Sequence, residues 1–122
     1  EEIESMYNQT KKSIILEFPA EGFDVIKELY EKLKELIKII DPDFEYTTIT
    51  LNKNVLCKPH FDANNKSPSI IIALGDFSGG ELNVENEKYD IKMRPLKFNG
   101  SKLKHWTEEF TGDRYSFIYY KN

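Results

Sequence analysis

Apolar residues recur at helical spacing in one stretch near the start of the sequence. Between residues 23 and 40 they fall mostly three or four positions apart, and Lys and Glu occupy most of the positions between them. This spacing is typical of an amphipathic helix with one buried face. Asp24 fits the N-cap of that helix, and Asp41-Pro42 ends it. The pattern predicts a helix over about 23–40, preceded by a strand at Ser13–Phe18.

After Pro42 the pattern changes to short runs rich in Thr, Ile, Val, Phe and Tyr, separated by Asn, Gly, Pro and Asp. Such runs are typical of β-strands joined by turns. Strands are predicted near Glu45–Leu51, Val55–Lys58, Ser69–Leu74, Glu81–Val84, Leu96–Phe98, Lys102–Trp106 and Arg114–Tyr120, with turns at Asp76–Gly80 and Asn99-Gly100. Many short strands indicate a mainly β barrel or sandwich, with the helix packed against one face of a sheet.

Composition limits the class of protein. The longest uninterrupted apolar run, Ile70–Leu74, is far shorter than the roughly 20 residues of a membrane-spanning helix, and no apolar leader opens the sequence. The single cysteine, Cys57, has no partner for an internal disulfide and is interpreted as a small core residue. We therefore expect a soluble intracellular protein, cytoplasmic or nuclear. Because the sequence opens on Glu1 and not on Met, we expect it to come from something longer.

The two histidines of the chain suggest a metal site. In His60-Phe61-Asp62 the first and third side chains point to one face if the segment is a strand, so both can reach one ion. His105 is the other histidine and completes a set of two imidazoles and one carboxylate. Such a set leaves three positions of an octahedral metal open, as in non-haem iron oxygenases, but it also suits zinc, nickel or manganese in a cupin-like barrel.

A cationic residue follows the second histidine. An α-keto acid that fills two open positions of the iron carries a second carboxylate, which calls for a guanidinium. Arg114 is the candidate, and in Arg114-Tyr115-Ser116 the serine lies on the same strand face and offers a second hydrogen bond. A cupin-like barrel has no need of such a carboxylate clamp. The arginine therefore favours the oxygenase hypothesis.

The ordered series His60-x-Asp62, His105 and Arg114-x-Ser116 resembles the signature of the iron(II)/2-oxoglutarate-dependent dioxygenase superfamily, over roughly Thr47–Tyr120. Gly79-Gly80-Glu81-Leu82 resembles the family's glycine turn into a middle strand, and 95–100 resembles the segment leading to the distal histidine.

The resemblance implies a double-stranded β-helix of the jelly-roll or cupin-like type. It implies one catalytic domain over 1–122, with helical support at about 23–40 and the β-helix core at about 44–121. It also implies that His60, Asp62 and His105 hold Fe(II), and that Arg114 and Ser116 hold 2-oxoglutarate. With dioxygen as the third reactant, such an enzyme hydroxylates a C–H bond and releases succinate and carbon dioxide.

The substrate is the least determined part of the prediction. The net charge of −4 is unusual for a strongly basic nucleic-acid binder, yet between Ile91 and Thr107 all charged residues are basic: Lys92, Arg94, Lys97, Lys102 and Lys104. This run, and a compact core that resembles the TET and J-binding-protein branch, favour a base or methylated base in nucleic acid. The alternatives are a prolyl-type protein hydroxylase acting on a peptide, and a catalytically inactive metal-binding β-barrel module.

Overall fold

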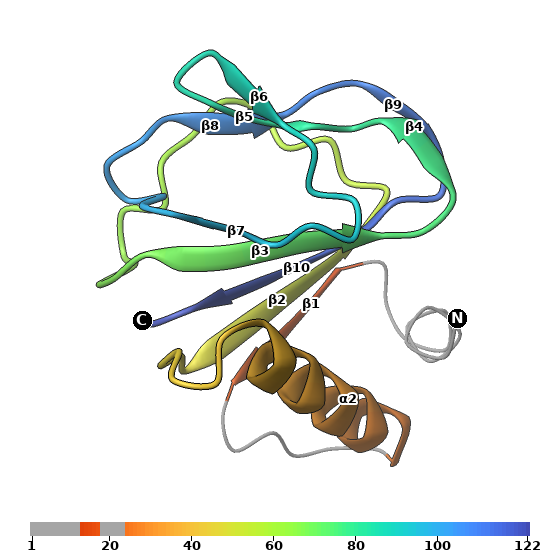
Figure 1. The fold of residues 1–122 in the computed structure, drawn as a ribbon, viewed down its shortest axis with the longest axis vertical. Coiled ribbons are helices and arrows are strands. Elements are labelled where there is room, and N and C mark those ends of the chain that lie inside the picture. The colour runs from red at the N-terminus through yellow and green to blue at the C-terminus, as the bar shows by residue number, and fades with distance from the viewer. Residues whose placement is uncertain (1–12, 18–23) are drawn as a thin grey trace.

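A helix and a series of short strands make up the part of the chain that the structure describes, residues 13–17 and 24–122 of the computed structural model (Figure 1). The elements before the β core are β1 (Ser13–Glu17) and α2 (Asp24–Ile40). The strands that follow are β2 (Thr48–Lys53), β3 (Ser69–Leu74), β4 (Phe77–Gly79), β5 (Leu82–Val84), β6 (Glu87–Tyr89), β7 (Leu96–Phe98), β8 (His105–Thr107), β9 (Phe110–Gly112) and β10 (Tyr115–Tyr120). The prediction of a mainly β fold with one long helix before it is confirmed.

The strands form sheets that face each other. The largest sheet has five strands in the order β1-β2-β10-β3-β7, a second has three in the order β6-β5-β8, and β4 pairs with β9. All pairings between these strands are antiparallel. Figure 1 shows the two smaller sheets on one side of the five-stranded sheet and α2 on the other. This is the double-stranded β-helix, or jelly roll.

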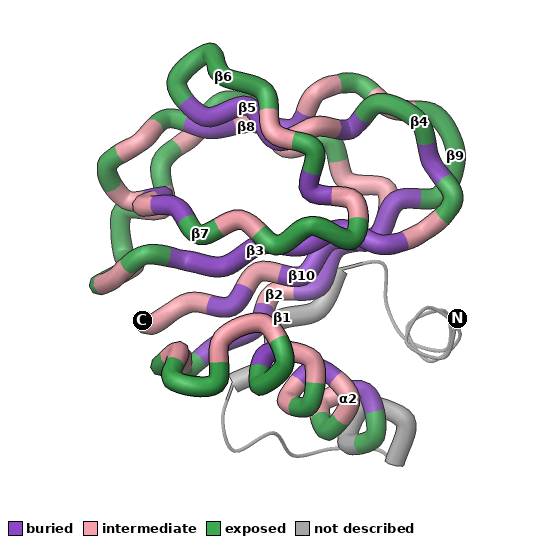
Figure 2. Tube along the Cα trace, viewed as in Figure 1, coloured by how far each residue is buried: buried purple, intermediate pink, exposed green. Residues whose placement is uncertain are grey.

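The five-stranded sheet separates two hydrophobic cores. On its outer face, Leu29, Leu33 and Ile37 of α2 pack against β2, β3 and β10. On its inner face, Ile71 and Ala73 of β3 belong to the core shared with β4, β5 and β7. Because β3 is covered on both faces, all six of its residues are buried, which explains the continuous apolar run in the sequence. Figure 2 shows this burial along β3 and β10, in contrast to the exposed turns.

Several predicted strand limits were wrong, and the reasons are local. Val55–Lys58 is not a strand, because Asn54 adopts a left-handed backbone (φ 55°) that turns the chain at the end of β2. The predicted turn Asp76–Gly80 contains β4, which pairs with β9 more than thirty positions along the chain, a partner that no local pattern indicates. The strands β6 and β9 were missed as well, because each has only three residues, none of them fully buried, and shows no apolar alternation.

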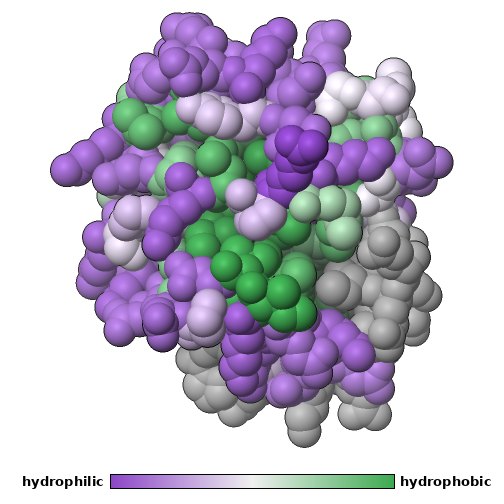
Figure 3. All heavy atoms as spheres, viewed as in Figure 1, coloured by the Kyte–Doolittle hydropathy of each residue, from purple (hydrophilic) through white to green (hydrophobic). Residues whose placement is uncertain are grey.

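The surface in view is hydrophilic around most of its rim, with a hydrophobic area near its centre (Figure 3). The large hydrophobic side chains most exposed to solvent among the described residues are Ile39, Leu56, Phe61 and Met93. Within the described ranges, no helix combines the length and the hydrophobicity needed to cross a membrane.

Candidate metal centre

His60, Asp62 and His105 come together where β8 meets the connection between β2 and β3. His105 is the first residue of β8, and His60 and Asp62 lie in the connection between β2 and β3. The His60 N–H donates to the His105 carbonyl and the His105 N–H donates to the His60 carbonyl, both at 3.0 Å. The Asp62 N–H donates to the Gly100 carbonyl at 2.9 Å. The prediction that His60 and Asp62 lie on a strand was wrong, because only this single bridge forms, yet the side chains still converge.

The three side chains offer ligand atoms that all lie within 4.8 Å of one another. Asp62 Oδ2 lies 3.0 Å from His105 Nε2, and Asp62 Oδ1 lies 3.4 Å from His60 Nε2. Two atoms bound at right angles to one ion, each at about 2.1 Å, are about 3 Å apart. The spacing of these donors therefore fits one divalent cation, and their chemistry fits the facial set of two histidines and one carboxylate.

Both imidazoles are oriented by backbone carbonyls. His60 Nδ1 lies 2.6 Å from the Lys58 carbonyl oxygen, and His105 Nδ1 lies 2.8 Å from the Leu103 carbonyl oxygen. Since a carbonyl oxygen only accepts, we assign the proton of each neutral ring to Nδ1. In this tautomer Nε2 of each neutral ring carries the lone pair that a metal ligand needs.

His105 is the more buried of the two rings, with 4% of its surface exposed. Burial lowers the pKa of His105, but the hydrogen bond from its ring to Asp62, the contact with the Leu103 carbonyl and the charge of Asp62 together raise that pKa above its ordinary value. The Asp62 carboxylate thus favours a positive charge at Nε2. A metal ion bound here takes the place of that proton, so metal binding releases it.

Gly100 leaves the space that the Asp62 carboxylate occupies. A Cβ atom at this position would lie 2.7 Å from Asp62 Oδ2 and 3.2 Å from His105 Cε1. Its carbonyl also accepts the Asp62 N–H. Gly100 therefore positions the carboxylate both by a hydrogen bond and by the absence of a side chain, a role that the sequence pattern showed only as a turn.

Arg114 lies immediately before β10 and is 3% exposed. Its Nε donates to the Gly80 carbonyl at 3.1 Å, and its guanidinium lies 5.7 Å from the ring centres of both Phe77 and Phe110. Its Nη2 is buried without a hydrogen-bond partner, and it takes part in no ion pair with the described residues. Burial lowers the pKa of Arg114. A guanidinium held in this way has unused capacity for an anion.

The backbone of Arg114 is held by Asn54. The Asn54 side-chain oxygen accepts the Arg114 N–H at 2.7 Å, and the Asn54 N–H donates to the Arg114 carbonyl at 2.8 Å. The Asn54 amide also donates to Asp113 Oδ1 at 3.0 Å. Asn tolerates the left-handed backbone found here, which places both its backbone and its side chain against 113–114.

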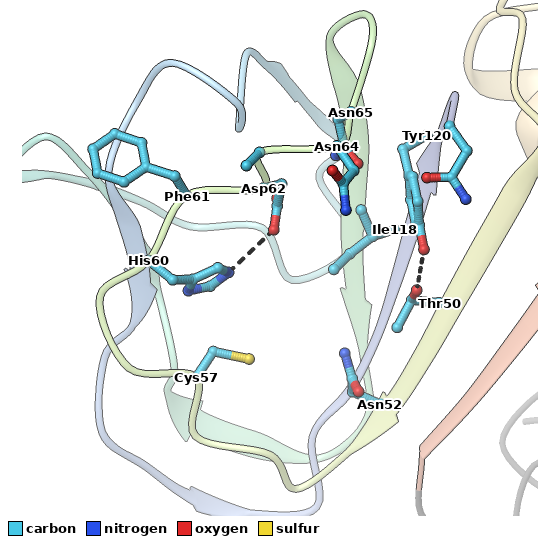
Figure 4. Close-up of a pocket in the computed structure, with 12 residues that line it drawn as sticks. Thr50, Asn52, Cys57, His60, Phe61, Asp62, Asn64, Asn65, Ile118 and Tyr120 are labelled. Atoms are coloured by element: carbon cyan, nitrogen blue, oxygen red, sulfur yellow. Dashed lines mark hydrogen bonds and ion pairs between the residues drawn. The ribbon is translucent and has the colours of Figure 1, made fainter.

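A narrow cavity of about 30 Å³ connects the arginine with the histidines. His60, His105, Arg114 and Ser116 all line it, so the structure brings four of the five predicted site residues to this cavity, and Asp62 lines the wider pocket. A wider pocket of about 510 Å³ opens beside Asp62 (Figure 4). Four side chains line both spaces: Asn52, Cys57, His60 and Ile118. Cys57 is half-buried at this junction, so its interpretation as a core residue was wrong.

The basic residues between Ile91 and Thr107 are in different environments. The Lys92 ammonium donates to the Phe77 carbonyl at 3.1 Å, and the Lys97 ammonium lies 3.4 Å from Asp41 Oδ2. The others are exposed and make no ion pair with the described part of the chain: Arg94, Lys102 and Lys104. The run is therefore only partly available to an outside anion.

Comparison with known proteins supports the fold through structure alone. No protein-family model matches the chain, and no curated protein matches its sequence. NgTET1, solved in complex with 5mC DNA, superposes with a TM-score of 0.74 at 18% identity, over 98% of this chain and 64% of that one. An oxidoreductase of the 2OG-Fe(II) oxygenase family from Burkholderia pseudomallei superposes with a TM-score of 0.66 at 14% identity, over 97% of this chain and 74% of that one.

The chain has the fold of the 2-oxoglutarate and iron(II) oxygenases. The fold-class prediction, a double-stranded β-helix supported by one helix, is confirmed by these likenesses. The chain spans 64% of the NgTET1 chain, so this likeness leaves a third of that protein without a counterpart.

Proposed function

We propose that this chain is an iron(II)- and 2-oxoglutarate-dependent dioxygenase that hydroxylates a C–H bond. The observation that carries the proposal is the buried guanidinium of Arg114, which has an unpartnered Nη2 and lines the same cavity as His60 and His105. Burying a charge without a partner is costly, so such an arginine is expected where a ligand supplies the anion. An acid with a second carboxylate, held at the metal by its other end, supplies that anion.

The metal ligands in this proposal are His60 Nε2, one oxygen of Asp62 and His105 Nε2. Bound iron(II) would supply the oxygen chemistry, in which 2-oxoglutarate is oxidised to succinate and carbon dioxide while the substrate gains a hydroxyl. The chain itself orients both imidazoles through the Lys58 and Leu103 carbonyls. It thereby engages Nδ1 of each ring in a hydrogen bond and leaves Nε2 of each ring as the atom that binds the metal.

The proposed co-substrate ligands are Arg114 and Ser116. Both are buried, and both line the narrow cavity. The distal carboxylate pairs with the guanidinium, and the Ser116 hydroxyl donates a second hydrogen bond. Because the guanidinium is buried, with the rings of Phe77 and Phe110 beside it, the pairing takes place at low dielectric, where it is strong.

Calorimetry under anaerobic conditions tests the enzyme class. We expect iron(II) to bind first, 2-oxoglutarate to bind only in the presence of the metal, and succinate to appear once air is admitted. His60→Ala or Asp62→Ala should abolish iron binding. Metal binding without co-substrate binding would contradict the proposal and favour the cupin-like metal site or the inactive module.

For the substrate we propose a base in nucleic acid. NgTET1, which shares the fold, was solved with 5mC DNA. The wider pocket beside Asp62 is lined by neutral hydrogen-bonding side chains, among them Asn52, Asn64 and Tyr120, and by Phe61, which is 52% exposed. Amides recognise the edge of a base, and an exposed aromatic ring at the rim can stack on one. Arg94, Lys102 and Lys104 are available for phosphates.

The nucleic-acid proposal is tested by salt-dependent binding to methylated and unmethylated DNA and RNA. Reversing the charges of Lys102 and Lys104 should weaken binding for every sequence and reduce the salt slope by about 2, because each phosphate contact contributes about 1. Charge reversal of Lys88, which is exposed on β6, is the matched control. Unchanged binding in the double variant would contradict the phosphate role, and turnover of a peptide in place of a base would identify a protein hydroxylase.

A further inference from the structure

Cys57 is one of the four side chains that line both spaces of the site. It is half-buried and lines both the wide pocket of about 510 Å³ and the narrow cavity of about 30 Å³. Figure 4 shows its sulfur pointing into the pocket between His60 and Asn52. The Thr107 N–H donates to the Cys57 carbonyl at 3.0 Å, which holds this segment against β8. The thiol is therefore open to small reagents from the wide pocket.

The second observation is the arginine in the same cavity. Arg114 is 3% exposed, and its Nη2 has no partner. Burial lowers the pKa of Arg114, and Arg114 and Cys57 line the same narrow cavity. A cavity with an unpaired guanidinium attracts anionic groups, including an anion on sulfur.

We propose that Cys57 is a covalent-modification site, oxidised by hydrogen peroxide to a sulfenic acid that excludes the co-substrate from Arg114. In this step the thiolate sulfur attacks one peroxide oxygen, an S–O bond forms, and the O–O bond breaks. The departing hydroxide takes up a proton and leaves as water. The sulfur is oxidised by two electrons and the peroxide is reduced by two.

The consequence follows from the size of the cavity. The cavity has only about 30 Å³, so one added oxygen atom at the junction takes up much of the path that a dicarboxylate must follow. The sulfenate also offers Arg114 an anion in place of the co-substrate carboxylate. Cys57 is the single cysteine of the chain, so no internal disulfide forms from it, and an added thiol reductant reverses the oxidation. The blocking effect rests on the proposed function, whereas the oxidation itself does not.

The single cysteine makes the experiment unambiguous, because any thiol label reports on Cys57. Metal-free protein is treated with peroxide, the sulfenic acid is trapped with dimedone and seen by intact mass, and the denatured protein shows the total thiol. A second sample is freed of peroxide and titrated with manganese(II) and then 2-oxoglutarate. We expect native trapping at one site, unchanged manganese binding, and 2-oxoglutarate affinity weaker by about tenfold or more, restored by dithiothreitol.

Two comparisons make the result decisive. In Cys57→Ala, peroxide should leave 2-oxoglutarate affinity unchanged, and in the native protein manganese(II) with 2-oxoglutarate should slow alkylation of the thiol by iodoacetamide. Trapping only after denaturation would overturn the modification site, and full 2-oxoglutarate affinity after oxidation would overturn the block. If untreated protein binds no 2-oxoglutarate, the proposed function fails, while native trapping still decides whether Cys57 is oxidised.

Discussion

The substitution Arg114→Met tests separately what the buried guanidinium costs in folding stability and what it contributes to co-substrate binding. Methionine follows a similar path between Phe77 and Phe110 but carries no charge and donates no hydrogen bond. If the arginine exists to bind a carboxylate, the substitution should remove co-substrate affinity and leave the fold intact. The metal ligands lie on other segments of the chain, so metal affinity should not change.

The size of the binding loss follows from the burial of the pair. Removing one partner from a buried, hydrogen-bonded charge pair costs about 2–5 kcal/mol. At about 1.4 kcal/mol for each factor of ten, 2-oxoglutarate affinity should fall by about 30-fold to several thousand-fold. Arg114→Lys keeps the charge but loses the planar fork, and its Nζ also loses the geometry with which Nε donates to the Gly80 carbonyl. We expect its affinity to lie between those of the native protein and Arg114→Met.

Unlike the co-substrate affinity, the folding stability of Arg114→Met is not expected to fall. Met removes a charge whose burial costs several kcal/mol, and it leaves the Gly80 carbonyl without its donor, which costs about 1–3 kcal/mol. These terms offset each other, so the free energy of unfolding of the ligand-free protein should stay nearly the same or rise. A guanidinium that had an acidic partner would instead cost about 3–5 kcal/mol on removal.

Urea denaturation and anaerobic calorimetry on the same samples provide the test. The reasoning is refuted by either of two results: a variant that loses about 3 kcal/mol or more of stability, which means that the arginine is a structural ion pair, or a variant that keeps 2-oxoglutarate affinity. Native-like binding of manganese(II) to the variant is the control for an intact metal centre.

Three further predictions concern single positions. Gly100→Ala places a methyl group against Asp62 Oδ2 and should weaken manganese(II) binding by about tenfold or more in a metal titration; native affinity would contradict the steric role. Asn54→Gly keeps the left-handed backbone but loses the hydrogen bond to the Arg114 N–H, so calorimetry should show weaker 2-oxoglutarate binding at unchanged metal affinity. A variant that binds 2-oxoglutarate as tightly as the native protein would exclude a positioning role for Asn54. Burial, with a smaller effect of Tyr46, raises the pKa of Tyr119, so the stability linked to its neutral hydroxyl is complete below the unfolded pKa of about 10 and is lost as the pH rises above that value. Urea titrations should therefore show that Tyr119→Phe loses less stability at alkaline pH than the native protein, and identical pH profiles of the two proteins would count against this.

The elements with a strong local pattern were predicted well. The helix was expected over 23–40 and observed at Asp24–Ile40, and β3 and β7 have the predicted limits. In these segments either one face or both faces are buried in a hydrophobic core, so the spacing of apolar residues in the sequence directly reflects which positions are buried. The short strands β4, β6 and β9 have no such record, because most of their residues are exposed or half-buried. β4 and β9 are defined by pairing with each other across more than thirty positions, and β6 by a hairpin with β5.

The candidate site was likewise predicted only in part. The types and order of His60, Asp62, His105 and Arg114 suggested the chemistry from the sequence, because few residues suit a divalent metal and a carboxylate. The prediction that a shared strand brings His60 and Asp62 together was wrong. Two backbone hydrogen bonds between His60 and His105, and one from the Asp62 N–H to the Gly100 carbonyl, hold these residues in place.

By itself the sequence determined which side chains this protein has available for chemistry, and where its helix and its buried central strand lie, since both are properties of residue type and local spacing. Only the tertiary structure decided that the Arg114 guanidinium is buried with an unpartnered Nη2, that Asn54 and Gly100 hold the functional groups in place, and that Cys57 lies between the two spaces. These are relations between segments far apart in the chain. They depend on the register of the sheets and on which atoms exclude water, and neither quantity is encoded within a local window of sequence.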